Sequence, residues 1–293
     1  MAAPLIVAGR GNVGRSLARA FKAAGLPCHL VAARDGAPRL VRGLSGRAHA
    51  LVLLAVPDGA VAQVATAIAE ADARLEPSVS FAHISGALGL DALDALRGRH
   101  AVGSFHPLRA IPRPLPPDAL KGIVVAVDGS TEGLRTKLSS LARKIGARPR
   151  MVAGSDRVLY HAAAVFASNY AVALLEQAAE LLEQIGWTQR EAVSGLLPLM
   201  TGAVDATKDR PLASVLTGPI RRGDVSTVSR HLEALARLPG SSSDRPSALD
   251  LYRMLGAITL QIAREAGLDA AAAERVRRAL TPDVAATRRR LRR

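Results

Sequence analysis

A glycine-rich segment close to the N-terminus constrains the fold of this chain more than any other feature. The segment follows the apolar run Pro4–Ala8 and directly precedes a helical pattern. Between a buried strand and a helix, Gly9 makes a tight turn, Gly11 lets the backbone approach a pyrophosphate, and Gly14 packs the helix on the strand. The residues that we expect to contact a dinucleotide here are Gly9, Arg10, Gly11, Asn12, Val13 and Gly14.

The next strand indicates which dinucleotide is bound. Cys28–Ala33 ends about 20 residues after the last glycine, where such units place the residue that contacts the adenosine ribose. An acidic residue there would bind the 2′-hydroxyl of NAD, whereas Arg34 suits the 2′-phosphate of NADP. The pattern therefore favours NADP(H). A shift of the strand boundary by one residue would place Asp35 there instead, and NAD would then be the alternative.

The hydrophobic pattern divides the chain into two parts. With 293 residues, 49% of them hydrophobic, the chain is long enough for a substantial core and two domains. Short β-rich runs alternate with helical segments up to about residue 152, which predicts an α/β domain with a mainly parallel sheet at residues 1–152. Only helical patterns follow, so we expect an all-α domain at residues 153–293.

The individual elements follow from the same pattern. The predicted strands are Leu5–Ala8, Cys28–Ala33, Leu51–Val56, Val79–Ile84, Ala101–His106 and Ile123–Asp128, with Ala147–Val152 as an edge strand. The predicted helices include residues 58–74, 131–146, 156–185, 225–238, 249–266 and 270–280, and another behind a capping box at Thr188. Ser155 is the predicted N-cap of the long helix, and residues 110–117 are too rich in proline for anything except an extended loop.

Composition limits the classes of function. The net charge of +14 includes five arginines in the last six residues, but no nucleic-acid-binding motif accompanies them and aromatic residues make up only 3% of the chain. The charge therefore favours phosphorylated cofactors or acidic metabolites over nucleic acid. The apolar runs are shorter than a membrane span and the first strand begins at once, so we expect a cytoplasmic protein. The single cysteine excludes an internal disulfide, and the scattered histidines predict no metal site.

Polar residues at the ends of three predicted strands are the first candidates for a pocket. Ligands of open α/β sheets bind outside the carboxyl ends of the strands. After one strand come Val56, Pro57 and Asp58, which we expect to contact the cofactor. After the next strand come His83 and Ser85, which we expect to contact the substrate, and His106 ends the fifth strand. Each group also has a structural interpretation, as a helix start, a turn or an extended linker.

The long helix and one later loop supply the remaining candidates. His161 and Ser168 lie within about 20° of each other around the helix, whereas Asn169 is rotated by about 80° from His161. His161 has the acidity of a proton donor near neutral pH. The alternative interpretation of this residue is a buried structural histidine. In the loop, Arg222 is expected to bind an anionic group of the substrate, the alternative being a plain helix connection in which Asp224 caps the next helix.

Together these segments resemble the Rossmann-like, DUF2520-containing family of oxidoreductases, a relative of pyrroline-5-carboxylate reductases, ketopantoate reductases and β-hydroxyacid dehydrogenases. The resemblance covers nearly the whole chain. It rests on residues 9–14, 56–58, 83–87, 105–108, 160–169, 217–220 and 222–224.

The resemblance implies a Rossmann-type NADP-binding domain followed by a helical domain like that of 6-phosphogluconate dehydrogenase, which in such relatives often forms a homodimer. β-Hydroxyacid dehydrogenases carry a lysine and an asparagine on the long helix, but this helix has Asn169 and no lysine. Their proton-transfer mechanism is therefore in doubt here.

The sequence predicts an NADP(H)-dependent oxidoreductase that transfers hydride to or from a small C=O or C=N substrate. The expected catalytic residues are His106, His161 and Asn169, and the expected substrate-binding residues are His83, Ser85, Ser168 and Arg222. A non-catalytic NADP-binding sensor or scaffold protein is the alternative.

Overall fold

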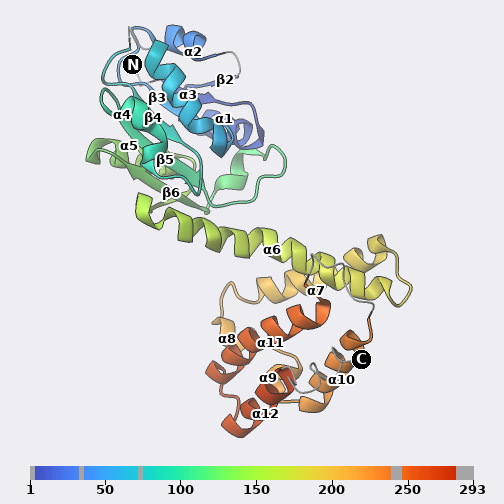
Figure 1. Cartoon of the computed structure of the whole chain (residues 1–293). Helices are drawn as coiled ribbons and strands as arrows, with labels where there is room; N and C mark the ends of the chain where they lie inside the picture. The colour runs from blue at the N-terminus through green and yellow to red at the C-terminus, as the bar shows by residue number, and fades with distance from the viewer. Residues whose placement is uncertain (1–3, 33–35, 72–74, 239–245, 282–293) are drawn as a thin grey trace, which may run out of the picture. The chain divides into compact units, whose positions relative to one another are not determined.

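The computed structural model describes residues 4–32, 36–71, 75–238 and 246–281 (Figure 1), and it divides into two compact units, residues 1–171 and 172–293. The division falls within a long helix, α6 (Arg157–Glu183). The sequence pattern instead places a domain boundary at residue 152, where the last strand ends, and this boundary stays a prediction.

The first unit is built on one seven-stranded sheet with the order β2-β1-β3-β4-β5-β6-β7. Neighbouring strands are parallel except for the antiparallel pair β5 and β6, which confirms the predicted α/β class with a mainly parallel sheet. The strands are β1 (Leu5–Ala8), β2 (Cys28–Val31), β3 (Leu51–Leu54), β4 (Ser80–His83), β5 (Ala101–Pro107), β6 (Val124–Gly129) and β7 (Arg148–Met151).

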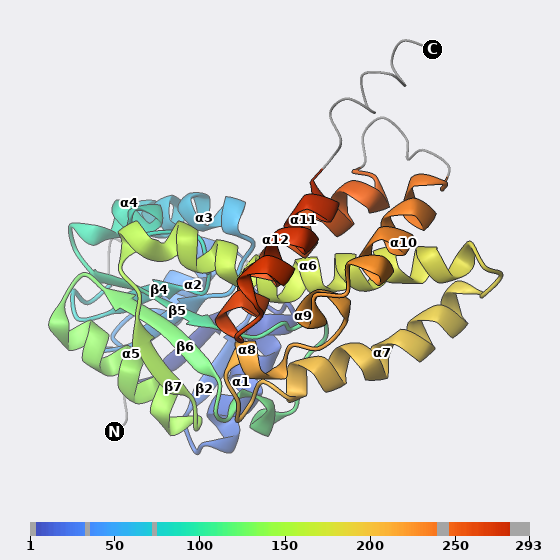
Figure 2. The same cartoon turned by 90° about the horizontal axis from the view of Figure 1, so that it is seen from below.

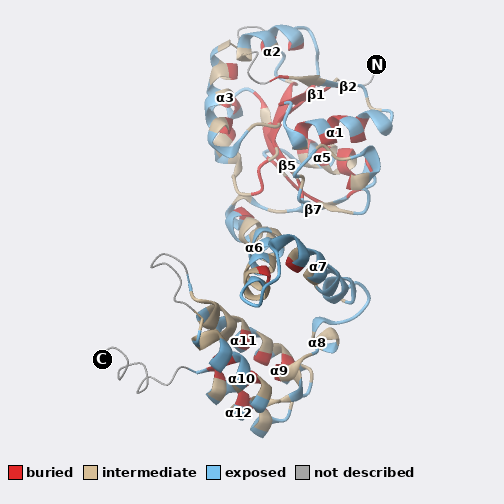
Figure 3. Ribbon diagram, turned by 90° about the vertical axis from the view of Figure 1, so that its right-hand side faces the viewer, coloured by how far each residue is buried: buried red, intermediate tan, exposed pale blue. Residues whose placement is uncertain are grey.

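Helices cover both faces of this sheet. Leu5 and Val7 of β1 point to a core shared with α1 (Asn12–Ala23) and α5 (Glu132–Lys144). The alternate residues Ile6 and Ala8 point to a second core, shared with α2 (Ala37–Leu44), α3 (Asp58–Ala71) and α4 (Asp94–Arg97). Successive residues of a strand face opposite sides, so a sheet buried on both faces has continuously apolar strands. Figure 3 shows the buried strands between the helices, and Figure 2 shows α5 beside β6 and β7.

The rest of the described chain is helical. The helices after α6 are α7 (Gln189–Asp205), α8 (Leu212–Val215), α9 (Pro219–Arg222), α10 (Val225–Ala236), α11 (Ala248–Glu265) and α12 (Ala270–Leu280). Helices α9 to α12 share a small core that includes Ile220, Val228 and Leu260. The capping box of Thr188 and the cap of Asp224 are present as predicted.

One local prediction is wrong, and the sequence analysis did not indicate helix α2. Ser155 lies inside a 3₁₀ turn, Gly154–Asp156, and its hydroxyl donates to Asp156 Oδ1, so it does not cap α6, which begins at Arg157. Helix α2 was not expected, because its eight residues include Pro38 and Gly43, which interrupt a helical pattern.

Within the described part of the chain, one helix is long and apolar enough to cross a membrane. The segment Gly154–Glu183 has a mean hydropathy of 1.5 over its most apolar stretch, and none of that stretch is buried. The segment also contains the buried side chain of Arg157, which bonds to the sheet of the first unit. A lone apolar helix of this kind also occurs at protein interfaces, so it is weak evidence for a membrane.

Candidate functional site

The glycine turn lies between β1 and β3, at the point where the strand order reverses. Gly9 has a positive φ of 138°, and a Cβ there would lie 2.0 Å from the carbonyl oxygen of Ala55. A Cβ on Gly14 would lie 2.0 Å from the carbonyl oxygen of Gly9. Only glycine fits at either position, because backbone occupies the space of a side chain.

The middle glycine has the opposite environment. A Cβ on Gly11 would meet no atom within 4 Å, and no side chain caps the N-terminus of α1 that follows it. The first amide groups of a helix bind anions when they are left open. The turn therefore fits the pyrophosphate of a dinucleotide, outside the carboxyl ends of parallel strands. Asn12 donates its side-chain amide to Pro112 O at 2.7 Å, and Val13 packs partly against the core.

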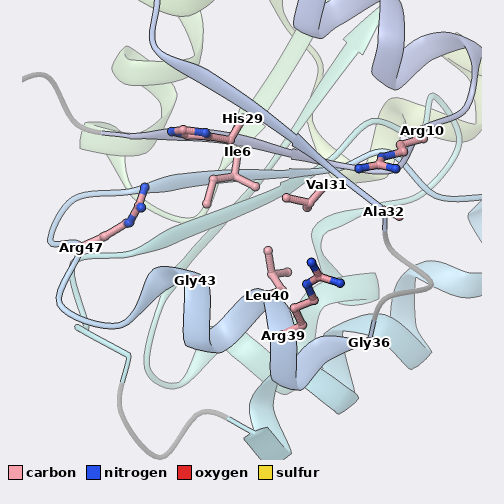
Figure 4. A pocket seen from close by; sticks show the side chains of 10 residues that line it. All are labelled: Ile6, Arg10, His29, Val31, Ala32, Gly36, Arg39, Leu40, Gly43 and Arg47. Atoms are coloured by element: carbon pink, nitrogen blue, oxygen red, sulfur yellow. The ribbon is translucent and has the colours of Figure 1, made fainter.

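A cavity of about 230 Å³ adjoins this turn, between β2 and α2. Three arginines line it, Arg10 in the turn, Arg39 on α2 and Arg47 after α2. Figure 4 shows the guanidinium groups of Arg10 and Arg39 at the end of the cavity near Ala32. Arg34 and Asp35, between which the choice of dinucleotide was left open, lie outside the described residues.

The polar ends of β3 and β4 meet through Asp58 and Ser85. The Ser85 hydroxyl donates to Asp58 Oδ2 at 2.7 Å and accepts the amide protons of Ala87 and Leu88, each at 3.1 Å. His83, at the end of β4, is fully buried; its Nε2 lies 3.0 Å from Gly89 O, and its Nδ1 has no partner. Val56 and Pro57 lie between β3 and α3, beside Asp58.

A buried arginine joins the ends of β4 and β5 to the first turn of α6. Arg157 is fully buried and donates to Ser85 O at 3.0 Å and to the Ser104 hydroxyl. Its Nε has no partner among the residues that the structure describes. Burial lowers the pKa of Arg157, and the nearby Asp128 carboxylate acts in the opposite direction. The site therefore contains a cation that solvent does not screen.

Two histidine rings meet over Gly86. A Cβ there would lie 2.8 Å from His161 Nδ1 and 2.9 Å from His106 Nε2, so glycine is what allows both rings to approach the backbone. The ring centroids of His106 and His161 are 6.5 Å apart. On its other side, His106 Nδ1 lies 2.7 Å from the hydroxyl of Tyr160.

Burial and charge keep two of these histidines neutral. Burial lowers the pKa of His83 to about 4 and that of His106 to about 4, and the charge of Arg157 adds to the effect in both cases. The Asp58 carboxylate opposes it. At neutral pH each imidazole is therefore an uncharged hydrogen-bonding group and not an imidazolium acid.

The remaining predicted residues lie elsewhere. Ser168 Oγ lies 2.8 Å from Ala164 O of its own helix and 2.9 Å from Asn169 Oδ1, about two turns of α6 beyond His161. Arg222 ends α9 in the second unit. Within the first unit the structure thus groups Asp58, His83, Ser85, His106 and His161, whereas the hydrogen bonds of Ser168 lie within α6.

Sequence reasoning missed three members of the site. Arg157 was not selected, although it is the only lysine or arginine in α6, and a lone cation on an apolar helix indicates a buried partner. Tyr160 was noticed but received no role, and Arg39 belongs to the unexpected helix α2. No local sequence signal identifies the partners of Arg157, because the residues that it contacts are 53 and 72 positions away.

The sheet order, the glycine turn at its switch point and the helices on both faces define a Rossmann-type protein. Residues 123–259 match a family described as Domain of unknown function (DUF2520), which confirms the resemblance to that family. A comparison with curated protein sequences finds no match.

Solved structures share the fold at low sequence identity. A protein from Bacteroides fragilis, described as a candidate NADP oxidoreductase, is 20% identical, with a TM-score of 0.64 over 89% of this chain and 98% of that one. Protein TM1727 from Thermotoga maritima is 22% identical, with a TM-score of 0.67 over 89% and 98%. The pyrroline carboxylate reductase of Plasmodium falciparum, solved with NADP bound, is 12% identical, with a TM-score of 0.51 over 95% and 98%.

Proposed function

We propose that this protein is an NADP(H)-dependent oxidoreductase acting on a small C=O or C=N substrate. The observation that carries the proposal is the open Gly11 turn before an uncapped helix, at the switch point of a parallel sheet. The structural neighbours described as NADP oxidoreductase and as a reductase with NADP bound support the same class. When bound, the dinucleotide would supply the hydride.

The arginine-lined cavity supports NADP(H) over NAD(H). Ala32 and Gly36 both line it, and the chain between them contains Arg34. Arg10 and Arg39 each bring a guanidinium group to this cavity. Guanidinium groups suit a 2′-phosphate because they form charge-assisted, bidentate hydrogen bonds. We assign Arg10, Arg34 and Arg39 to this phosphate.

The histidine cluster supports a role on the substrate. His106 and His161 would orient or polarise the reacting group, and Ser85 and Asp58 would form the polar wall next to the dinucleotide. His83 lies deeper and holds the loop at Gly89. Asn169, Ser168 and Arg222 stay candidates for substrate contacts, including an anionic group bound by Arg222.

We further propose that the protein is a cytoplasmic homodimer. Exposed apolar side chains on α6, among them Val158, Leu159 and Phe166, support this assembly, since large apolar patches usually mark interfaces.

Titration of the purified protein with NADPH and NADH tests the cofactor. Wild type is expected to bind NADPH more tightly, and replacement of Arg10 and Arg39 together by alanine should remove at least a tenfold preference while leaving NADH affinity nearly unchanged. Arg143→Ala, an exposed cation on α5 outside this cavity, is the matched charge control. If no dinucleotide binds, the oxidoreductase proposal is wrong.

A second experiment separates an enzyme from a non-catalytic sensor. NADPH oxidation is followed with a panel of small ketones, aldehydes and imines, for wild type and for the double variant His106→Gln/His161→Gln. Turnover that the variant loses while it still binds NADPH supports an enzyme. Binding without turnover of any compound favours the sensor.

A further inference from the structure

Tyr160 and His106 form a hydrogen-bonded side-chain pair beside Gly86. The phenol oxygen lies 2.7 Å from His106 Nδ1, and the two rings are nearly perpendicular, with centroids 5.6 Å apart. The pair joins the first turn of α6 to the end of β5. We infer that Tyr160 is a positioning residue that fixes His106 in the tautomer with its proton on Nε2, so that His106 presents a neutral N–H donor to a substrate carbonyl. The role of this donor rests on the proposed function.

Hydrogen-bond accounting favours one direction for the bond. A neutral imidazole has one nitrogen that donates and one that accepts, and a phenol has a single proton. Burial raises the pKa of Tyr160, so the phenol keeps its proton at neutral pH. If Nδ1 carried the imidazole proton, the phenol would accept it, and the phenol proton would have no partner among the described residues. When Tyr160 donates to Nδ1, the phenol proton and the Nδ1 lone pair are both paired, and only the Nε2 proton is left for a ligand.

The other nitrogen of His106 then carries the imidazole proton and is the accessible one. His106 Nε2 lies beside Gly86 and is not among the buried side-chain atoms that lack a partner. His161 Nδ1, which faces the same glycine, is among them. His106 Nε2 is therefore the nitrogen of the pair that can reach a ligand.

The surroundings of His106 favour an uncharged donor. Arg157 and His161 on α6 and His83 on β4 disfavour a positive charge on the ring, and Asp58 on α3 opposes them. Burial is the largest influence, and the pKa of His106 falls to about 4. Near neutral pH the ring donates a hydrogen bond without carrying charge, as a polarising group for a carbonyl does.

This tautomer has a consequence for the substrate. An N–H donor pairs with a lone pair, which a carbonyl oxygen has and the nitrogen of a protonated imine lacks. The buried positive charge of Arg157 also disfavours a cation in the vicinity. The site thus selects ketones or aldehydes over iminium ions.

Nitrogen-15 NMR of histidine-labelled protein tests the tautomer without any dinucleotide. The His106 signals are assigned from their loss in His106→Gln. At pH 7 we expect Nδ1 to resonate as an unprotonated nitrogen and Nε2 as a protonated one. In Tyr160→Phe the Nδ1 signal should shift toward that of a nitrogen without a donor.

The second unit supplies a matched control. Tyr252 lies 2.9 Å from His231 Nδ1 with the same perpendicular ring geometry, so Tyr252→Phe removes a similar pair and should leave the His106 signals unchanged. A protonated Nδ1 in wild type overturns the inference even if Tyr160→Phe fails to fold, and so does an unshifted Nδ1 in a folded Tyr160→Phe. Because the spectra are taken on free protein, failure of NADPH binding would count against the proposed function alone.

Discussion

Gly86 is the residue on which the spacing of both histidine rings depends. A methyl group there would lie within 2.9 Å of atoms in both rings, closer than packed atoms approach. Gly86→Ala must therefore displace His106 or His161, and overpacking of this kind costs about 1 to 3 kcal/mol. We expect a lower free energy of unfolding in urea and shifted ring signals for both histidines. Gly202→Ala is the control, because a Cβ there meets nothing and α7 should gain a few tenths to 1 kcal/mol. A variant as stable as wild type, with unshifted rings, would show that the site is not packed in this way.

The lowered pKa values of His83 and His106 predict how stability depends on pH. Both are near 4 in the folded protein, below the ordinary histidine value of 6.5. As pH falls from 6.5 to 4, the unfolded chain takes up protons that the folded protein does not, so stability should fall by up to about 1.4 kcal/mol per histidine for each pH unit. The loss from this source ends once the folded histidines are protonated below pH 4.

Urea unfolding at pH 7, 6, 5 and 4.5 measures this dependence. His106→Gln should lose less stability than wild type over the same range, because one of the two histidines is absent. Identical pH profiles for the two proteins would contradict the proposed environment of His106.

At the scale of residues, the sequence predicts which side chains lie at the site better than it predicts what those side chains contact. His83, His106 and His161 were selected because strand ends and the long helix place them near the ligand edge, and the structure does group them. The neutrality of His83 and His106 could not be predicted, since it depends on burial and on Arg157, whose bonds reach across 53 and 72 residues. Likewise Asn169 shares the helix of His161, but it lies on a different face and further along.

At the scale of elements, α1 does more than present the glycine turn. Its residues also anchor the proline-rich loop after β5: Asn12 donates to Pro112 O, Arg19 reaches the carbonyl groups of Pro114 and Leu115, and the Ser16 hydroxyl accepts the amide proton of Leu115 at 2.9 Å. The prediction of a loop holds for residues 110–116, whereas Pro117 begins a 3₁₀ helix, Pro117–Leu120, and the attachment to α1 was not predicted. The glycine turn is formed by residues that are adjacent in the sequence, so it can be predicted from them. The bonds that attach this loop to α1 join residues about 100 positions apart, so they cannot.

Ser16→Ala tests this anchor. Ser16 is fully buried, so its loss leaves the Leu115 amide without an acceptor, at a cost of about 1 to 3 kcal/mol. We expect lower stability in urea and faster hydrogen exchange at the Leu115 amide. Thr66→Ala is the matched control, because Thr66 makes only the bond to the carbonyl four residues earlier, which Ser16 also makes. Equal effects of the two substitutions would mean that the loop is held in another way.

At the scale of the whole molecule, the pattern of the elements predicts the fold class because strands buried on both faces are continuously apolar and helices have their own periodicity. Assembly is harder to predict, because the apolar surface of α6 could pack against a second copy or a membrane. Arg157 argues against a span that starts at Gly154, since it ties the first turn of α6 to the ends of β4 and β5. Polar side chains such as His161 and Asn169 also interrupt the apolar surface.

We therefore expect α6 to associate with a second copy of the chain, with Phe166 in the contact. Phe166 is 68% exposed and stacks edge to face with Tyr170, so the two rings form one apolar patch. Aromatic residues of this kind dominate interface energies, and a buried, unpaired carboxylate in their place would be strongly unfavourable. Sedimentation equilibrium should give a dimer for wild type and a monomer for Phe166→Asp at the same concentration. Gln184→Asp, which adds the same charge after the end of α6, should remain a dimer. A monomeric wild type that binds lipid vesicles would instead assign the exposed face of α6 to a membrane surface.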